Sequence, residues 1–242
     1  MRIPADVARE LAHDGVIRAA INFGNPVLAQ RDPASGEPRG VSVAIAHELA
    51  QRCGLPVSFV TFDAAGKVFA ALAQQAWDIA FLAVDPERAT QLDFTRPYVI
   101  IEGSYMVRTD SPLHSIDAFD RPGVRIAVGQ GSAYELHLSR TLRHAELVRA
   151  ATGAEAIARF LRDDLDAVAG VKSPLLRHAA QHPGLRVIDG RFMAIEQAVA
   201  VPKGRAHALR YLQEMLRELK QSGFIAHSLQ ETGQADALVA PL

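Results

Sequence analysis

The apolar run from Ile79 to Val84 stops at Asp85-Pro86, and this break constrains the fold more than any other feature of the chain. A short apolar run between turn-forming residues is typical of a strand buried on both faces, as in a parallel sheet covered by helices. Arg88 follows at the predicted junction of this strand with a helix. Open α/β sheets bind ligands at the carboxyl ends of strands, where a guanidinium can hold a carboxylate through two hydrogen bonds. Arg88 is therefore a candidate ligand anchor, although an arbitrary arginine is more often a solvated surface residue.

Apolar runs and amphipathic segments alternate along the whole chain, which predicts an α/β fold with mainly parallel sheets. Strands are expected at 16–22, 57–62, 78–84, 98–108, 124–128, 146–150, 165–170, 187–188 and 197–201. Helices are expected at 3–13, 42–53, 66–75, 134–142, 152–163, 174–181, 206–222 and 223–232. A break at residues 109–112 separates two halves of similar pattern, which predicts two lobes rather than one sheet.

Composition excludes several classes of protein. The chain has 242 residues, of which 49% are hydrophobic and 22% charged, the balance of a soluble globular protein. Its net charge of −1 gives no reason to expect nucleic-acid binding. The single cysteine, Cys53, cannot form an intrachain disulfide and is expected to be an inert buried thiol. No apolar run is long enough to span a membrane.

Motifs for other chemistry are missing from the sequence. The histidines form no spaced ligand cluster with cysteines or carboxylates, so no metal is expected. The glycine-rich turn at 129–133 lacks the rest of a phosphate-binding loop, and no serine lies in a nucleophile-elbow pattern, so no cofactor is expected either. The N-terminal residues lack the basic start and apolar core of a secretory signal.

An ordered set of short motifs resembles the periplasmic solute-binding proteins of family 3, which bind polar amino acids for ABC importers. The motifs are GVIRAAIN (15–22), WDIA (77–80), PERA (86–89), LDFTRPY (92–98), VRIAVGQGS (124–132), LDAV (165–168) and AVAVPKG (198–204). They follow the family's order over nearly the whole chain, and the central pair, PERA and LDFTRPY, is the most specific part of the set.

The resemblance implies a two-lobe Venus-flytrap fold of the type 2 periplasmic-binding class. Lobe one would contain residues 1–105 and 199–242, and lobe two residues 106–198. A ligand would bind in the cleft between the lobes, which would close over it by a hinge motion. The expected partner is an ABC permease, the expected oligomeric state is a monomer, and the expected location is periplasmic, with a cytoplasmic location as the alternative because no signal sequence is visible.

Four residues carry over from the family as ligand contacts. Arg88 falls on the arginine that clamps the ligand α-carboxylate, and Gly131 with Ser132 falls on the turn that completes the carboxylate site from lobe two. Ser132 is equally suited to cap the helix that follows. Asn22 matches a polar ligand contact at the end of the first strand, or it is an ordinary turn residue.

The chain departs from the family where the ligand ammonium group would bind. The family has an acidic residue at this position, but this chain has Val171. Either another acid binds the ammonium group or the ligand has none. Glu102 and Glu196 are the candidate replacements. Lys172 would instead bind a second carboxylate, in a dicarboxylic or keto acid, unless it is simply exposed.

Glu102 is unusual because it lies among apolar residues, where a charge needs a partner. That partner is either a ligand amine or a structural arginine such as Arg96 or Arg108. The ring that stacks on the ligand in relatives would fall near Ala65, which has no ring.

The favoured interpretation is a non-enzymatic binding protein for a small carboxylate-bearing ligand, an amino acid or a related organic acid, with no catalytic residue. The alternative from another class is a lyase that resembles cyclohexadienyl dehydratase on the same fold. Glu196, in the context IEQAV (195–199), would then protonate a leaving hydroxyl while Arg88 and Lys172 hold substrate carboxylates. A further alternative is an orphan ligand-sensing domain without a transporter.

Overall fold

The computed structural model describes residues 3–242, which form two compact units. Unit one contains the residues up to Ile100 together with Glu196–Leu242, and unit two contains Ile101–Ile195. The chain passes from one unit to the other within two long strands, β7 (Val99–Arg108) and β12 (Met193–Pro202). The sequence-based boundaries fall at 105/106 and 198/199, a few residues further along each of these strands.

Unit one is built on three parallel strands, with β1 in the middle. These strands are β4 (Val57–Phe62), β1 (Ile17–Asn22) and β5 (Ile79–Ala83). Antiparallel strands extend the sheet: β12 pairs with β5, β6 (Leu92–Phe94) pairs with β12, and β13 (Leu238–Val239) pairs with the first residues of β7. A hairpin of β2 (Gln30–Arg31) and β3 (Pro38–Arg39) lies apart from this sheet.

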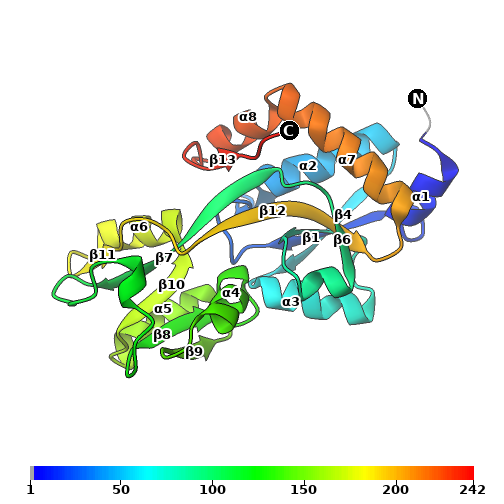
Figure 1. The fold of residues 1–242 in the computed structure, drawn as a ribbon. Coiled ribbons are helices and arrows are strands. Elements are labelled where there is room, and N and C mark those ends of the chain that lie inside the picture. The colour runs from blue at the N-terminus through cyan, green and yellow to red at the C-terminus, as the bar shows by residue number, and fades with distance from the viewer. Residues whose placement is uncertain (1–2) are drawn as a thin grey trace. The chain divides into compact units, whose positions relative to one another are not determined.

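The helices of unit one are α1 (Ala5–Leu11), α2 (Val41–Cys53), α3 (Ala65–Ala70), α7 (Ala206–Gln221) and α8 (Phe224–Glu231). Helix α1 lies beside α7 (Figure 1), where the Glu10 carboxylate accepts a hydrogen bond of 2.9 Å from the Ala208 N–H. Every residue of β5 is buried, as a strand covered by helices requires. Trp77, which precedes β5, is fully buried, and its indole N–H donates to the Val68 carbonyl at 2.9 Å.

Unit two has a four-stranded sheet in the order β7, β10, β8, β9. Strands β8 (Arg125–Gly129), β9 (Glu146–Ala150) and β10 (Ala167–Val171) are parallel, whereas β7 runs antiparallel to β10. A short strand, β11 (Leu185–Val187), adds to the other side of β7. The helices are α4 (Ala133–Thr141), α5 (Gly153–Arg162) and α6 (Lys172–Gln181), with a 3-10 turn, η3, at Ile116–Ala118.

Strand periodicity explains why unit two has two cores. Successive side chains of a strand point to opposite faces of the sheet. Tyr105 accordingly belongs to one buried cluster and Met106 to the other, and Val168 lies on the face opposite its neighbours in β10. The first cluster includes Phe119, which stacks on Tyr105 with a ring-centroid distance of 3.9 Å, and the second is built around Phe160.

The structure differs from the sequence-based expectations in short elements. The helix expected after Pro86 is only a 3-10 turn, η2 (Arg88–Thr90), and the helix expected over 66–75 becomes a 3-10 turn, η1 (Ala71–Gln74), after Ala70. The two-residue strands β2, β3 and β13 were not predicted, because two residues show no periodicity. Within residues 3–242, no helix is both long and apolar enough to cross a bilayer.

A buried carboxylate, Asp78, ties together distant parts of unit one. Its side chain accepts hydrogen bonds from the Arg18 backbone N–H at 3.1 Å and from the Arg18 guanidinium at 2.9 and 3.0 Å. Arg205, which precedes α7, adds a contact of 3.4 Å. Burial by itself would raise the pKa of Asp78, but the hydrogen bonds and charge of Arg18, together with the charge of Arg205, lower the pKa below its ordinary value.

We expect Asp78→Ala to destabilise the protein by about 3 kcal/mol, because it leaves two partly buried arginines without their carboxylate. Since the pKa of Asp78 is lowered in the folded state, its contribution is present above the ordinary carboxyl pKa near 4 and is lost as the pH falls further. Urea unfolding at pH 7 and pH 3 measures both effects. Asp236→Asn, which changes an exposed carboxylate of the same unit, is the control. An Asp78→Ala variant as stable as the control at pH 7 would contradict this account.

Candidate functional site

The parallel strands of unit one bring several predicted residues to one edge of the sheet. Because β1 and β5 run in the same direction, their carboxyl ends meet at that edge. Asn22 is the last residue of β1. At the end of β5, the Ala83 carbonyl accepts a hydrogen bond of 3.0 Å from the Arg88 guanidinium, and the Val84 N–H donates to the Glu196 carbonyl at 2.9 Å. Asn22, Arg88 and Glu196 thus belong to the same edge.

Arg88 lies inside unit one, with 1% of its surface exposed. Burial lowers the pKa of Arg88 to about 10, against the opposing effect of the charges of Asp85 and Glu87. Asp85 is also buried, and its carboxylate accepts the Glu87 N–H at 2.9 Å, which shapes the turn between β5 and η2. The guanidinium is therefore held by the protein in this structure, next to the end of a strand.

Asn22 makes the contact of a turn residue. Its side-chain oxygen accepts the Gly24 N–H at 2.9 Å, and the residue is half-buried. The next residue, Phe23, was not singled out from the sequence. Its ring lies 4.2 Å below the guanidinium carbon of Arg31, which is a cation–π contact. Phe23 supplies an aromatic ring at the same edge, and the signal that could have found it is its position immediately after the first strand.

Glu196 differs from Arg88 in its exposure. Its side chain is exposed, although its backbone belongs to β12 and its neighbours Ile195 and Gln197 are buried. This alternation along β12 places the Glu196 carboxylate on the open face of the strand. The group is accessible to a small molecule.

The turn after β8 in unit two holds the next pair of predicted residues, Gly131 and Ser132. Ser132 is the N-cap of α4, and its hydroxyl accepts the Glu135 N–H at 3.1 Å. The Gly131 N–H donates to the Glu135 carboxylate at 3.1 Å. This is a variant of the capping box, in which a serine and a glutamate three residues later satisfy the first N–H groups of the helix together. The helix-capping interpretation of Ser132 is confirmed.

Glu135 is a buried carboxylate that the sequence analysis did not identify. Besides the Gly131 N–H, it accepts hydrogen bonds of 2.8 Å from the Ser139 hydroxyl and from the Arg149 guanidinium. The positive end of the α4 dipole is therefore already matched by a carboxylate of the chain. The same arrangement recurs one strand away, where Thr152 caps α5 and Glu155 accepts the Ala151 N–H at 2.9 Å.

A cluster of three charged side chains lies at the carboxyl end of β10. Glu102 of β7 contacts the Lys172 ammonium at 3.3 Å and the Arg191 guanidinium at 2.9 Å. Val171 ends β10 and pairs with Gly103, so the cluster belongs to the same edge of the sheet as the turn before α4. The structure thus brings together two predicted site residues, Glu102 and Lys172, and adds Arg191.

Of the two partners considered for Glu102, a ligand amine or a structural arginine, the structure supplies the arginine, but it is Arg191 and not Arg96 or Arg108. Arg108 pairs with Asp164 at 3.0 Å and donates to the Leu165 carbonyl at 2.8 Å. Arg96 belongs to unit one, where its backbone N–H donates to the Gln213 side-chain oxygen at 3.0 Å. Lys172 is not a solvated lysine either, because its ammonium pairs with Glu102 and its side chain is only 26% exposed.

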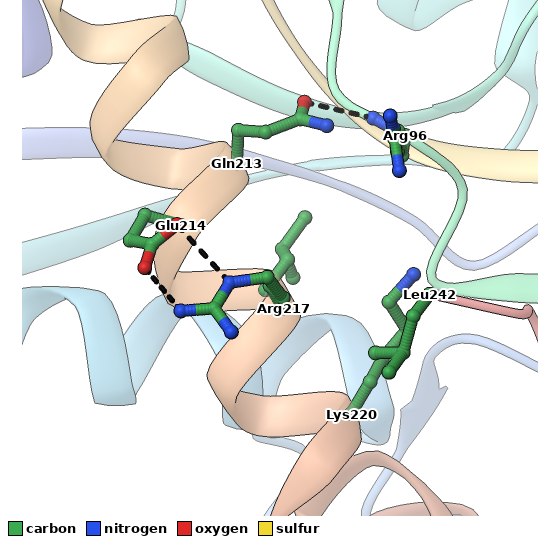
Figure 2. A pocket seen from close by; sticks show the side chains of 7 residues that line it. Arg96, Gln213, Glu214, Arg217, Lys220 and Leu242 are labelled. Carbon is green, nitrogen blue, oxygen red and sulfur yellow. Dashed lines mark hydrogen bonds and ion pairs between the residues drawn. The ribbon is translucent and has the colours of Figure 1, made fainter.

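A pocket of about 380 Å³ beside α7 in unit one is lined by none of the residues predicted to bind a ligand. Figure 2 shows Arg217 paired with Glu214 and the Arg96 backbone beside Gln213. The Lys220 ammonium donates to the carbonyls of Pro97 and Pro241, at 3.1 and 2.7 Å. Because none of the predicted ligand-binding residues lines it, this pocket is not the candidate site.

No metal centre accompanies the candidate residues. Within residues 3–242, histidine, cysteine and carboxylate side chains do not gather in groups of three or more that could hold a metal ion. Cys53 is buried, and burial raises the pKa of its thiol, in agreement with the inert thiol expected from the sequence.

Solved structures of binding proteins share this fold. The cysteine-binding protein from Campylobacter jejuni is 21% identical, with a TM-score of 0.80 over 94% of this chain and 96% of that chain. A mutant of ArgBP from T. maritima is 22% identical, with a TM-score of 0.79 over 93% and 98% of the two chains. The ancestral amino acid-binding protein AncCDT-1, a precursor of cyclohexadienyl dehydratase, is 23% identical, with a TM-score of 0.75 over 90% and 95%. No curated protein sequence matched the chain.

A family model matches almost the whole sequence. It covers residues 17–233 and describes the bacterial extracellular solute-binding proteins, family 3. The match includes every strand of the two sheets except β13, and all the candidate residues described above. The two-unit α/β fold and the type 2 periplasmic-binding class expected from the sequence are confirmed. The chain belongs to the bacterial extracellular solute-binding proteins, family 3.

Proposed function

We propose that this protein captures a small carboxylate-bearing solute, an amino acid or a related organic acid, and delivers it to an ABC permease. The observation that carries the proposal is the gathering of charged and polar side chains at the carboxyl ends of the parallel strands, in each of the two units. This is where α/β proteins bind small ligands. A periplasmic location follows from the same proposal, since the family is extracellular.

The proposal gives each unit a share of the ligand. In unit one, Arg88 would bind the ligand carboxylate, with Asn22 and Glu196 at the same edge. In unit two, Ser132 and Gly131 would contribute from the turn before α4, and Glu102 with Lys172 from the end of β10. Glu135 already accepts the Gly131 N–H, so a ligand carboxylate at this turn would have to share or replace that contact.

Binding is expected to raise the melting temperature. A ligand present at a hundred times its Kd stabilises the native state by about 2.7 kcal/mol. For a chain of this size that corresponds to an increase of roughly 5–10 °C. A thermal-shift screen against amino acids, keto acids, dicarboxylates and the corresponding amides measures it, with the amides, which lack the carboxylate charge, as control. The proposal would be contradicted if only the amides raised the melting temperature, or if no carboxylate raised it.

The role of Arg88 needs a test that separates binding from folding. Arg88→Met alone leaves the buried Asp85 carboxylate beside an apolar side chain, and we expect it to cost about 3 kcal/mol of stability. The double variant Asp85→Asn/Arg88→Met removes both charges, and an asparagine oxygen can still accept the Glu87 N–H. If Arg88 binds the carboxylate, the double variant retains the fold and loses at least about a hundredfold in ligand affinity, measured by calorimetry, because a charge-assisted bidentate contact is lost.

The matched control for that variant is Asp85→Asn with Arg88 intact. It should bind the ligand within a few-fold of the unmodified protein. Equal affinities for the single and double variants would show that Arg88 is a structural residue and would remove it from the binding site.

The second candidate function is a lyase that resembles cyclohexadienyl dehydratase. The observation that favours it is the exposed carboxyl group of Glu196, which lies in β12 beside the end of β5. A positioned carboxyl group can protonate a leaving hydroxyl. The binding proposal predicts that prephenate and arogenate remain intact after prolonged incubation with the protein, as measured by mass spectrometry. Formation of an aromatic product that disappears in Glu196→Gln would favour the lyase instead.

A further inference from the structure

The charged cluster of Glu102, Lys172 and Arg191 in unit two narrows the class of ligand. Lys172 begins α6, Arg191 lies in the loop before β12, and Glu102 lies in β7, so three separate segments bring these side chains together. Their exposed fractions are 26% for Lys172, 50% for Arg191 and 39% for Glu102. The cluster is accessible, and it carries two positive charges against one negative charge.

The hydrogen-bonding capacity of Lys172 and Arg191, like their charge, favours an anionic ligand group at this cluster. A guanidinium has five N–H donors and an ammonium has three. The contacts with Glu102 use one donor of Arg191 and one of Lys172, and no other hydrogen bond of these two cationic groups is found within residues 3–242. Most of their donors therefore remain for an acceptor. Each oxygen of Glu102, by contrast, already faces a cation.

The start of α6 adds to the positive field of the cluster. The N-termini of α4 and α5 are each matched by a glutamate of the chain, Glu135 and Glu155. Helix α6 has no side-chain cap and no acidic residue in its first turn, and Lys172 is its first residue. Pro174 in the first turn has no N–H, but the positive end of the helix dipole favours an anion beside Lys172.

From this cluster we infer that the ligand is a dianion without an ammonium group, such as a dicarboxylic acid or a keto diacid. Lys172 and Arg191 bind its second carboxylate, and Glu102, whose two oxygens are paired with these cations, does not bind an amine. The inference rests on the proposed function, because it assumes that the first carboxylate binds elsewhere in the protein. The family resemblance places the ammonium site at Val171, next to this cluster. An ammonium group there would meet two like charges and one carboxylate that is already paired, and Glu196, the other acid considered for that role, belongs to unit one.

Calorimetry with a matched pair of ligands tests the inference directly. 2-Oxoglutarate and L-glutamate share a carbon skeleton and both carboxylates, and they differ in a keto group against an ammonium group. We expect 2-oxoglutarate to bind at least tenfold more tightly than L-glutamate, and succinate and glutarate to bind more tightly than propionate. Equal or tighter binding of L-glutamate would overturn the inference.

Three variants assign the roles within the cluster. Lys172→Gln and Arg191→Gln should each lower the affinity for 2-oxoglutarate at least tenfold and leave the affinity for propionate unchanged. Glu102→Gln should raise the affinity for 2-oxoglutarate, because it removes the carboxylate that competes for the same cations. Arg177→Gln removes an exposed positive charge from α6 and is the control for a general change in charge. The melting temperature of each unliganded variant establishes that it is folded.

The outcomes separate this inference from the proposed function. If neutral amino acids bind and no dicarboxylate does, the protein is a solute-binding protein and the inference is overturned. A fall in 2-oxoglutarate affinity in Glu102→Gln, with no effect of Lys172→Gln or Arg191→Gln, overturns it as well. If no carboxylate of any kind binds, the proposed function fails and the inference fails with it.

Discussion

Parallel pairing on both sides of a central strand is the constraint from which the arrangement of polar groups follows. In unit one, β1 lies between β4 and β5, and in unit two, β8 lies between β9 and β10. Parallel neighbours end at the same edge, so the turns that follow them are brought together even when they are far apart in the sequence. The apolar interior of each sheet leaves this edge as the place where charged side chains can reach solvent or a ligand.

At that edge, carboxylates of the chain itself accept some of the backbone N–H groups that could otherwise bind a ligand anion. Glu135 and Glu155 each accept an N–H that precedes a helix, and Asp85 does the same in the turn before η2. Helix N-termini that are matched in this way attract a ligand anion less strongly than open ones. The open start of α6, beside Lys172, is thus electrostatically different from the starts of α4 and α5. Selectivity among ligands can arise from which helix starts are left open.

Local patterns made much of the fold predictable. The bounds of β4 and β9 agree with the sequence-based expectations: turn-forming residues stand on both sides of β4, and Thr152-Gly153 follows β9 closely. The capping role of Ser132 was anticipated, and the glutamate three residues later completes a recognisable local pattern that would have identified Glu135. The 3-10 turn at Arg88 was not predicted, since a turn of three residues leaves no periodic signal.

Contacts between distant segments could not be predicted from the sequence. Lys172 lies 70 residues from Glu102, and Arg191 lies 89 residues from it. Only the pairing of β7 with β10, and the hydrogen bond of the Phe192 N–H with the Gly103 carbonyl, reveal that the three meet. The sequence offered Arg96 and Arg108 because they are near Glu102 along the chain. Similarly, the burial of Arg88 depends on the packing of unit one as a whole, whereas the pattern around it indicated only that a strand ends there.

The double passage of the chain through β7 and β12 has a consequence for biosynthesis. Unit two is one continuous segment, Ile101–Ile195, whereas unit one needs residues from both sides of it. A chain that enters its folding compartment N-terminus first can therefore complete unit two while β5 still lacks its neighbour β12 and α1 still lacks α7. Until those last segments arrive, the first hundred residues carry an unpaired strand edge, which is the kind of surface that chaperones protect.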